Sequence, residues 1–166
     1  MPPAFVPSHI TWFGATHTAV SLLPVLIGLY LYIAKGKIDL KTGLGKAYWG
    51  LSLIGAISAL FIFHHGGFGP GHIVSIAMIV VLLLAALVAW IVKTKTRTLE
   101  IIFVALSYFF LWFFVTTETL TRIPVAKPFA SDPAAPALIP VRLGMLVLMV
   151  IGIVLQVRAD KKHLTA

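Results

Sequence analysis

The chain has no cysteine and few charged residues, and each of these shortages excludes a class of protein. It contains no cysteine, so it has no disulfide, no thiolate metal ligand and no thiol nucleophile. Charged residues make up only 11% of the sequence, whereas a soluble domain has about a quarter. We find neither a phosphate-binding loop nor a catalytic triad in the sequence. Thiol chemistry is therefore excluded, and the common nucleotide-binding and hydrolase signatures are absent.

Apolar residues, in contrast, are abundant. They make up 60% of the 166 residues, and the mean hydropathy is +1.03. A chain of 18.0 kDa does not hide that much apolar surface in an ordinary aqueous fold. Membrane-spanning helices satisfy their backbone hydrogen bonds internally. The composition therefore predicts an all-α, polytopic membrane helix bundle in a lipid bilayer, with residues 1–166 forming a single domain.

Five long apolar segments indicate five transmembrane helices, since a helix needs about 20 residues to cross the hydrocarbon. The expected helices cover residues 12–34, 47–63, 72–91, 99–117 and 138–157. Pro24 falls inside the first segment and is tolerated in a membrane helix. The N-terminal sequence MPPAFVPSHITWFG has no basic residue, which argues against a cleaved signal peptide. We therefore expect the first segment to be retained.

Basic residues are concentrated in three regions that lie between or after the expected helices. These regions hold ten of the thirteen basic residues: Lys35, Lys37, Lys41, Lys46, Lys93, Lys95, Arg97, Arg158, Lys161 and Lys162. The positive-inside rule places such regions in the cytoplasm. We predict an outside N-terminus, a cytoplasmic C-terminus and a bacterial inner-membrane location. The net charge of +8 then serves orientation and contact with anionic lipid, and we expect no nucleic-acid partner.

Four of the six histidines fall where three expected helices reach the outer side. His17 lies in the first helix, His64 and His65 end the second, and His72 begins the third after a glycine-rich turn. The turn is short, so the second and third helices are expected to be antiparallel neighbours. Small residues at helical spacing favour His65 over His64 for the inward position. An ionisable group at membrane depth indicates a functional site by default.

The histidine group predicts a bound haem b or a transition metal ion. Two imidazoles from different helices hold a haem iron axially, whereas three or four hold copper or zinc. The best candidate ligands are His17, His65 and His72, with His64 next. In the alternative interpretation, these histidines cap helix ends and contact headgroups or water.

A second polar group is expected on the same side. Arg142 lies just inside the fifth helix, where an arginine must pair or reach the interface. The nearest acidic residue in the expected topology is Glu118, so we predict a Glu118–Arg142 ion pair. The pair is interpreted first as a structural clasp. The functional alternatives are a proton carrier at Glu118 and an anchor at Arg142 for an acidic group such as a haem propionate.

Three short elements carry a resemblance to a known family. They are His17, the GKAY sequence at 45–48 and the SAL sequence at 58–60. The first half of the chain in this way resembles a family of small bacterial predicted integral membrane proteins of unknown function. Where that family often has a histidine before the GKAY-like element, this chain has Lys41. The resemblance implies a membrane helical fold and brings no activity with it.

Three functional hypotheses follow from these patterns. The first is a histidine-lined site at the outer face that binds haem b or a metal for electron transfer or cofactor handling. The second is a structural or accessory subunit of a larger membrane complex, or a homo-oligomer, without a cofactor of its own. The third is a small transporter in which the same histidines act as proton or ion sites.

Overall fold

The computed structural model describes residues 11–63, 67–91, 97–123 and 127–165, and every regular element in these ranges is helical. The elements are α1 (Trp12–Lys35), α2 (Gly43–Ala59), α3 (Pro70–Ala86), the π-helical turn η1 (Leu87–Ile91), α4 (Thr98–Arg122), the 3-10 turn η2 (Pro136–Leu138) and α5 (Ile139–Thr165). The predicted all-helical class is confirmed for this part of the chain, which contains five α-helices.

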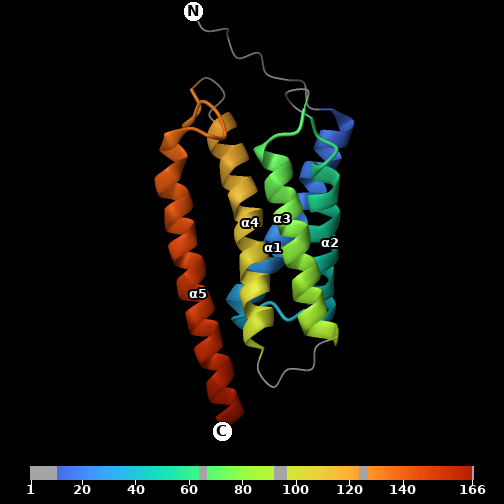
Figure 1. Cartoon of the computed structure of the whole chain (residues 1–166), viewed down its shortest axis with the longest axis vertical. Helices are drawn as coiled ribbons and strands as arrows, with labels where there is room; N and C mark the ends of the chain where they lie inside the picture. The colour runs from blue at the N-terminus through green and yellow to red at the C-terminus, as the bar shows by residue number, and fades with distance from the viewer. Residues whose placement is uncertain (1–10, 64–66, 92–96, 124–126, 166) are drawn as a thin grey trace, which may run out of the picture.

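Helices α1 to α4 form a four-helix bundle, and α5 lies outside it (Figure 1). Contacts join α1 to α2, α2 to α3 and α3 to α4, and contacts between α1 and α4 close the ring. The fifth helix packs against α4 and η2. In the most apolar stretch of Pro70–Ile91, 44% of the residues are buried, against 6% in Pro136–Lys162. α5 is therefore a peripheral element of the fold.

The lengths and the apolar composition of the helices indicate a membrane environment. Among the described residues, four segments are long and apolar enough to cross a membrane: Trp12–Lys35, Pro70–Ile91, Thr98–Arg122 and Pro136–Lys162. α2 has 17 residues, which is fewer than the about 20 that a crossing helix needs. The fold is that of an integral membrane protein, and the side of the membrane on which each end lies stays a prediction.

Polar residues at helix ends explain where the boundaries differ from the predicted ones. α2 begins before residue 47 because the Thr42 hydroxyl oxygen caps the helix by accepting the N–H of Gly45 at 3.1 Å. α4 and α5 end at Arg122 and Thr165, beyond their predicted apolar segments. Hydropathy marks the apolar part of a helix, whereas caps and charged side chains set its ends.

Glycines allow the bundle helices to approach closely. A methyl group on Gly28 of α1 would overlap the Tyr108 ring of α4, and one on Gly55 of α2 would lie 2.8 Å from the Ser21 hydroxyl oxygen of α1. Small residues at helix contacts are typical of packing in membranes. Tyr48 is fully buried beside them and hydrogen-bonds to a serine of α4 at 2.8 Å. These contacts fix the helices relative to one another and so position the polar groups at both ends.

Candidate functional site

Polar side chains gather at the two ends of the bundle. The end at which α1 and α3 begin is called the histidine end and is defined by His17, Ser58, His72, Glu118 and Arg142. The opposite end, at which α1 ends and α4 begins, is called the arginine end and is defined by Asp39, Arg97, Glu100 and Asp160.

His17 is held by a serine of the neighbouring helix. Its Nδ1 atom lies 2.7 Å from the Ser58 hydroxyl oxygen, which joins α1 to α2. That hydroxyl group donates its single hydrogen to the Gly55 carbonyl oxygen at 3.0 Å. Ser58 then accepts from His17, so we assign the hydrogen of the neutral imidazole to Nδ1. The assignment leaves a lone pair on Nε2, as in an imidazole that binds a metal or accepts a proton.

His72 carries its hydrogen on the other nitrogen. The ring stacks against both Phe63 and Phe68, with centroid distances of 4.9 and 5.1 Å, and the residue is 8% exposed. Its Nδ1 accepts the N–H of Gly69 at 3.1 Å, so the hydrogen of the neutral ring is on Nε2. Nε2 is buried and has no hydrogen-bond partner among the described residues. His72 thus offers a hydrogen-bond donor, whereas His17 offers a lone pair.

Only part of the predicted four-histidine group falls within the described chain. His64 and His65 lie outside the described residues, and their role stays a prediction. His17 and His72 make separate contacts, His17 to Ser58 of α2 and His72 to Gly69 at the start of its own helix. Within the described ranges, no group of three or more histidine, aspartate or glutamate residues is placed to hold a metal ion. His17 is the described residue whose geometry best fits a ligand.

The structure differs from the predicted Glu118–Arg142 ion pair. Glu118 pairs with Arg122 of the same helix at 2.6 Å. The Arg142 guanidinium donates to the Pro133 carbonyl oxygen at 2.6 Å and lies 4.5 Å from the centre of a phenylalanine ring of α4. A residue one helical turn away reaches Glu118 more easily than a residue of another helix.

The arginine end carries a denser polar group, which the sequence analysis missed. The Arg97 guanidinium donates to Asp39 Oδ2 and Glu100 Oε1, both at 2.7 Å, and to Glu100 Oε2 at 3.1 Å. The backbone N–H of Arg97 donates to Asp160 of α5 at 3.2 Å. Glu100 is only 3% exposed, and Arg97 places the opposite charge beside its buried carboxylate. One residue thereby connects the α1–α2 loop, α4 and α5.

The signal for this group lay in the acidic residues. The chain has only five of them, and three, Asp39, Glu100 and Asp160, lie beside the basic regions that were assigned to one side. The positive-inside rule weighs lysine and arginine and gives little weight to aspartate and glutamate. An acidic residue inside a strongly basic region indicates an ion pair with one of the basic side chains. This pattern at Asp39, Glu100 and Asp160 predicts a polar network at the arginine end.

Charge pairing shifts two pKa values at the arginine end. Burial opposes the charged guanidinium, but the hydrogen bonds from Arg97 to Glu100 and Asp39 outweigh it and raise the pKa of Arg97. Burial also opposes the charged form of Asp39, and the hydrogen bond from Arg97 outweighs it, so the pKa of Asp39 lies below its ordinary 3.8. Both side chains are therefore charged throughout the neutral range.

Comparisons with known proteins place no further constraint on either end of the bundle. No protein-family description, no curated protein and no solved structure matches the chain.

Proposed function

We propose that the protein binds a metal centre at its histidine end, as haem b or as a transition metal ion, for electron transfer or cofactor handling. The observation that carries the proposal is the His17–Ser58 hydrogen bond, which orients the ring and leaves a lone pair on Nε2. Metal-binding histidines almost always donate their other ring N–H to an oxygen or water. His17 is accordingly the ligand in this proposal.

His72 has a different role in the proposal. Binding a metal through its Nε2 would move the ring hydrogen to Nδ1, where it would face the N–H of Gly69. Two donors would then oppose each other without an acceptor, which disfavours that tautomer. His72 therefore positions the start of α3 and presents a donor, and His64 and His65 remain the sequence-based candidates for a second ligand.

The orientation belongs to the same proposal. With ten of the thirteen basic residues assigned to the opposite side, the histidine end faces the outside of a bacterial inner membrane. Membership of the family that the sequence resembles is proposed as well. What supports it is that two residues of the shared elements, His17 and Ser58, contact each other directly.

An optical spectrum and a metal analysis of the purified protein test this function. We expect a haem spectrum or a bound metal in the wild type and its loss in His17→Ala. Ser58→Ala removes the acceptor that orients His17, so the affinity should fall by about 10- to 100-fold. His72→Phe is the matched control and should keep the cofactor. A colourless, metal-free wild type that neither haem nor metal ions reconstitute would contradict the proposal.

A second candidate function is a subunit of a larger membrane complex or of a homo-oligomer. The observation that favours it is the position of α5, which packs against α4 and is otherwise largely open. A helix with so little contact inside its own chain has a wide apolar face that another membrane protein can cover.

Native electrophoresis in a mild detergent tests the second candidate. We expect the wild type to migrate above the monomer. Leu148→Trp on α5 should shift it to the monomer, because Leu148 is 69% exposed. Leu26→Trp on α1, at a residue that is 61% exposed, is the control and should not. This function would be excluded if the wild type migrated as a monomer both when extracted directly from native membranes and when purified in detergent.

A further inference from the structure

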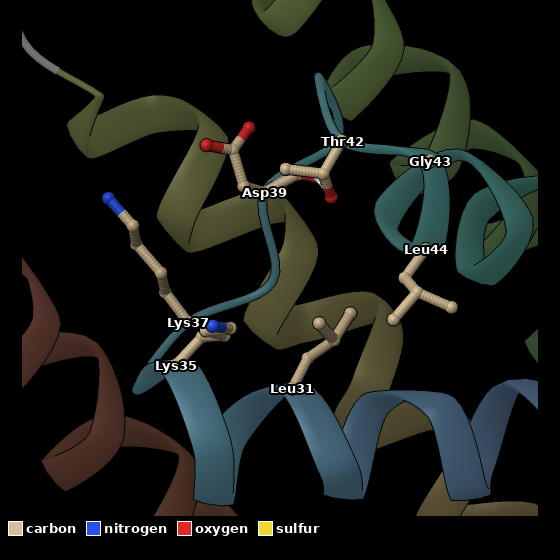
Figure 2. A pocket seen from close by; sticks show the side chains of 7 residues that line it. All are labelled: Leu31, Lys35, Lys37, Asp39, Thr42, Gly43 and Leu44. Carbon is tan, nitrogen blue, oxygen red and sulfur yellow. Dashed lines mark hydrogen bonds between the residues drawn. The ribbon is translucent and has the colours of Figure 1, made fainter.

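A pocket opens at the arginine end, beside the point where α1 ends and α2 begins (Figure 2). Its volume is about 350 Å³, and small-molecule sites measure about 300–1,000 Å³. The pocket is lined by Leu31, Lys35, Lys37, Asp39, Thr42, Gly43 and Leu44. These residues form two chemically distinct parts, an apolar floor and a basic rim.

The apolar floor comes from two leucines of adjacent helices. Leu31 of α1 and Leu44 of α2 point toward each other across the hollow (Figure 2). Leu31 is buried, whereas Leu44 is 47% exposed, so the floor runs from the core to the outer surface of the bundle. It lies at the end of the membrane-length segment Trp12–Lys35, where hydrocarbon gives way to the polar layer.

The basic rim comes from the end of α1 and the following loop. Lys35 ends α1, and Lys37 follows it in the loop. The acid on the rim, Asp39, attracts Lys37 but already binds Arg97 at 2.7 Å, so its charge is shared. α2 begins beside the rim with no acidic residue in its first turn, and a helix N-terminus favours negative charge. The rim therefore has a positive potential next to an apolar floor.

We propose that this pocket binds one anionic phospholipid, with its phosphate at Lys35 and Lys37 and its upper acyl carbons on Leu31 and Leu44. The basic rim favours a negatively charged headgroup, and the apolar floor favours an acyl chain. A soluble phosphate would contact the rim and leave the floor uncovered. Basic pockets between membrane helices bind lipid headgroups elsewhere by the same attraction. The proposal is independent of the metal centre at the histidine end, which lies at the other end of the bundle.

Lipid retention by the full-length protein tests the rim. The protein is reconstituted in nanodiscs of phosphatidylcholine with phosphatidylglycerol, and retained lipid is measured by native mass spectrometry. Lys35→Gln with Lys37→Gln should weaken phosphatidylglycerol binding by about 25-fold, because each lysine near an anionic surface contributes about fivefold. Lys41→Gln with Lys46→Gln removes the same charge outside the pocket and should change binding by less than about twofold. An equal loss in both variants would overturn the pocket in favour of diffuse attraction.

A second arm tests the floor and separates a lipid from a soluble ligand. Leu44→Asn keeps both lysines and should lower phosphatidylglycerol retention, because the acyl chain loses its apolar contact. Leu44 is half-exposed, so circular dichroism should show an unchanged helix content. An excess of glycerol 3-phosphate should leave the retained lipid in place. Displacement by glycerol 3-phosphate would overturn the lipid and identify a free phosphate ester as the ligand. Full retention in Leu44→Asn would overturn the proposed contact between the acyl chain and the floor.

Discussion

The two ends of the bundle hold their polar groups in opposite ways. At the arginine end, Arg97 satisfies carboxylates from the α1–α2 loop and α4, and its backbone binds α5. At the histidine end, Glu118 pairs within its own helix and His72 caps its own first turn, with Nε2 left unpartnered in the described chain. Arg97 connects three elements of the chain, whereas at the histidine end His17 joins only α1 to α2 through Ser58 and keeps a lone pair on Nε2. We therefore expect the arginine end to contribute more to stability than the histidine end.

This division predicts that the arginine end controls stability. Arg97→Met should lower the free energy of unfolding in detergent by about 3–5 kcal/mol, because it leaves the buried Glu100 carboxylate without its positively charged partner. The measurement is denaturant unfolding followed by circular dichroism. Arg158→Met, at an exposed arginine of the same end, should change stability by less than about 0.5 kcal/mol. Equal effects of the two substitutions would show that the network contributes nothing beyond net charge.

Backbone packing at the arginine end gives the next largest effect. A methyl group on Gly45 would overlap the Asp39 carbonyl oxygen, so Gly45→Ala should cost about 1–3 kcal/mol by forcing the loop away from α2. Gly50→Ala is the control in the same helix. It meets no atom within 4 Å and should stabilise by about 0.5–1 kcal/mol, since alanine favours the helix. Thermal unfolding of both variants checks the opposite signs.

Acid should weaken the arginine end through Asp39. Its pKa is below 3.8 in the folded state, so the unfolded chain binds the proton more readily. The stabilisation that Asp39 provides is fully present at pH values above its pKa in the unfolded chain, 3.8. It is lost as the pH falls from 3.8 through the lower pKa of Asp39 in the folded protein. Asp39→Asn should therefore be less stable than the wild type at neutral pH and approach it in acid. A stability difference that stays constant between about pH 7 and pH 2.5 would contradict the linkage.

The histidine end should tolerate change at its most buried residue. His72→Phe keeps the ring stacking and removes a buried donor that lacks a described partner, but it also removes the acceptor for the Gly69 N–H. The two effects oppose each other, each being about 1–2 kcal/mol, and we expect a net change of less than about 1 kcal/mol. A larger loss would show that His72 belongs to an extended network and would remove the contrast between the ends.

The sequence predicted the elements of the fold better than their contacts. Long apolar segments predicted the helices, and the cap at Thr42 shows why α2 starts earlier than its apolar part. Rows of small residues correctly indicated close packing, as at Gly55, because small side chains are needed wherever membrane helices touch. The peripheral position of α5 was not predictable, since a lipid-facing helix and a buried one are equally apolar.

The candidate site was predictable to a smaller extent. The sequence predicted that His17 lies in the first helix near its outer end, and the structure adds its contact with Ser58 of α2. The tautomers of His17 and His72 follow from hydrogen bonds to Ser58 and Gly69, which no spacing rule contains. Arg97 and Asp39 are far apart in the sequence, and their contact depends on how the α1–α2 loop meets the start of α4. Such contacts require the packed structure.

The peripheral position of α5 also bears on how the protein is made. The ring of α1 to α4 closes without α5, so it can assemble while the last helix is still being synthesised. We therefore expect biogenesis in two stages, closure of a four-helix unit followed by late addition of α5, whose far end is held by the bond from the Arg97 backbone to Asp160.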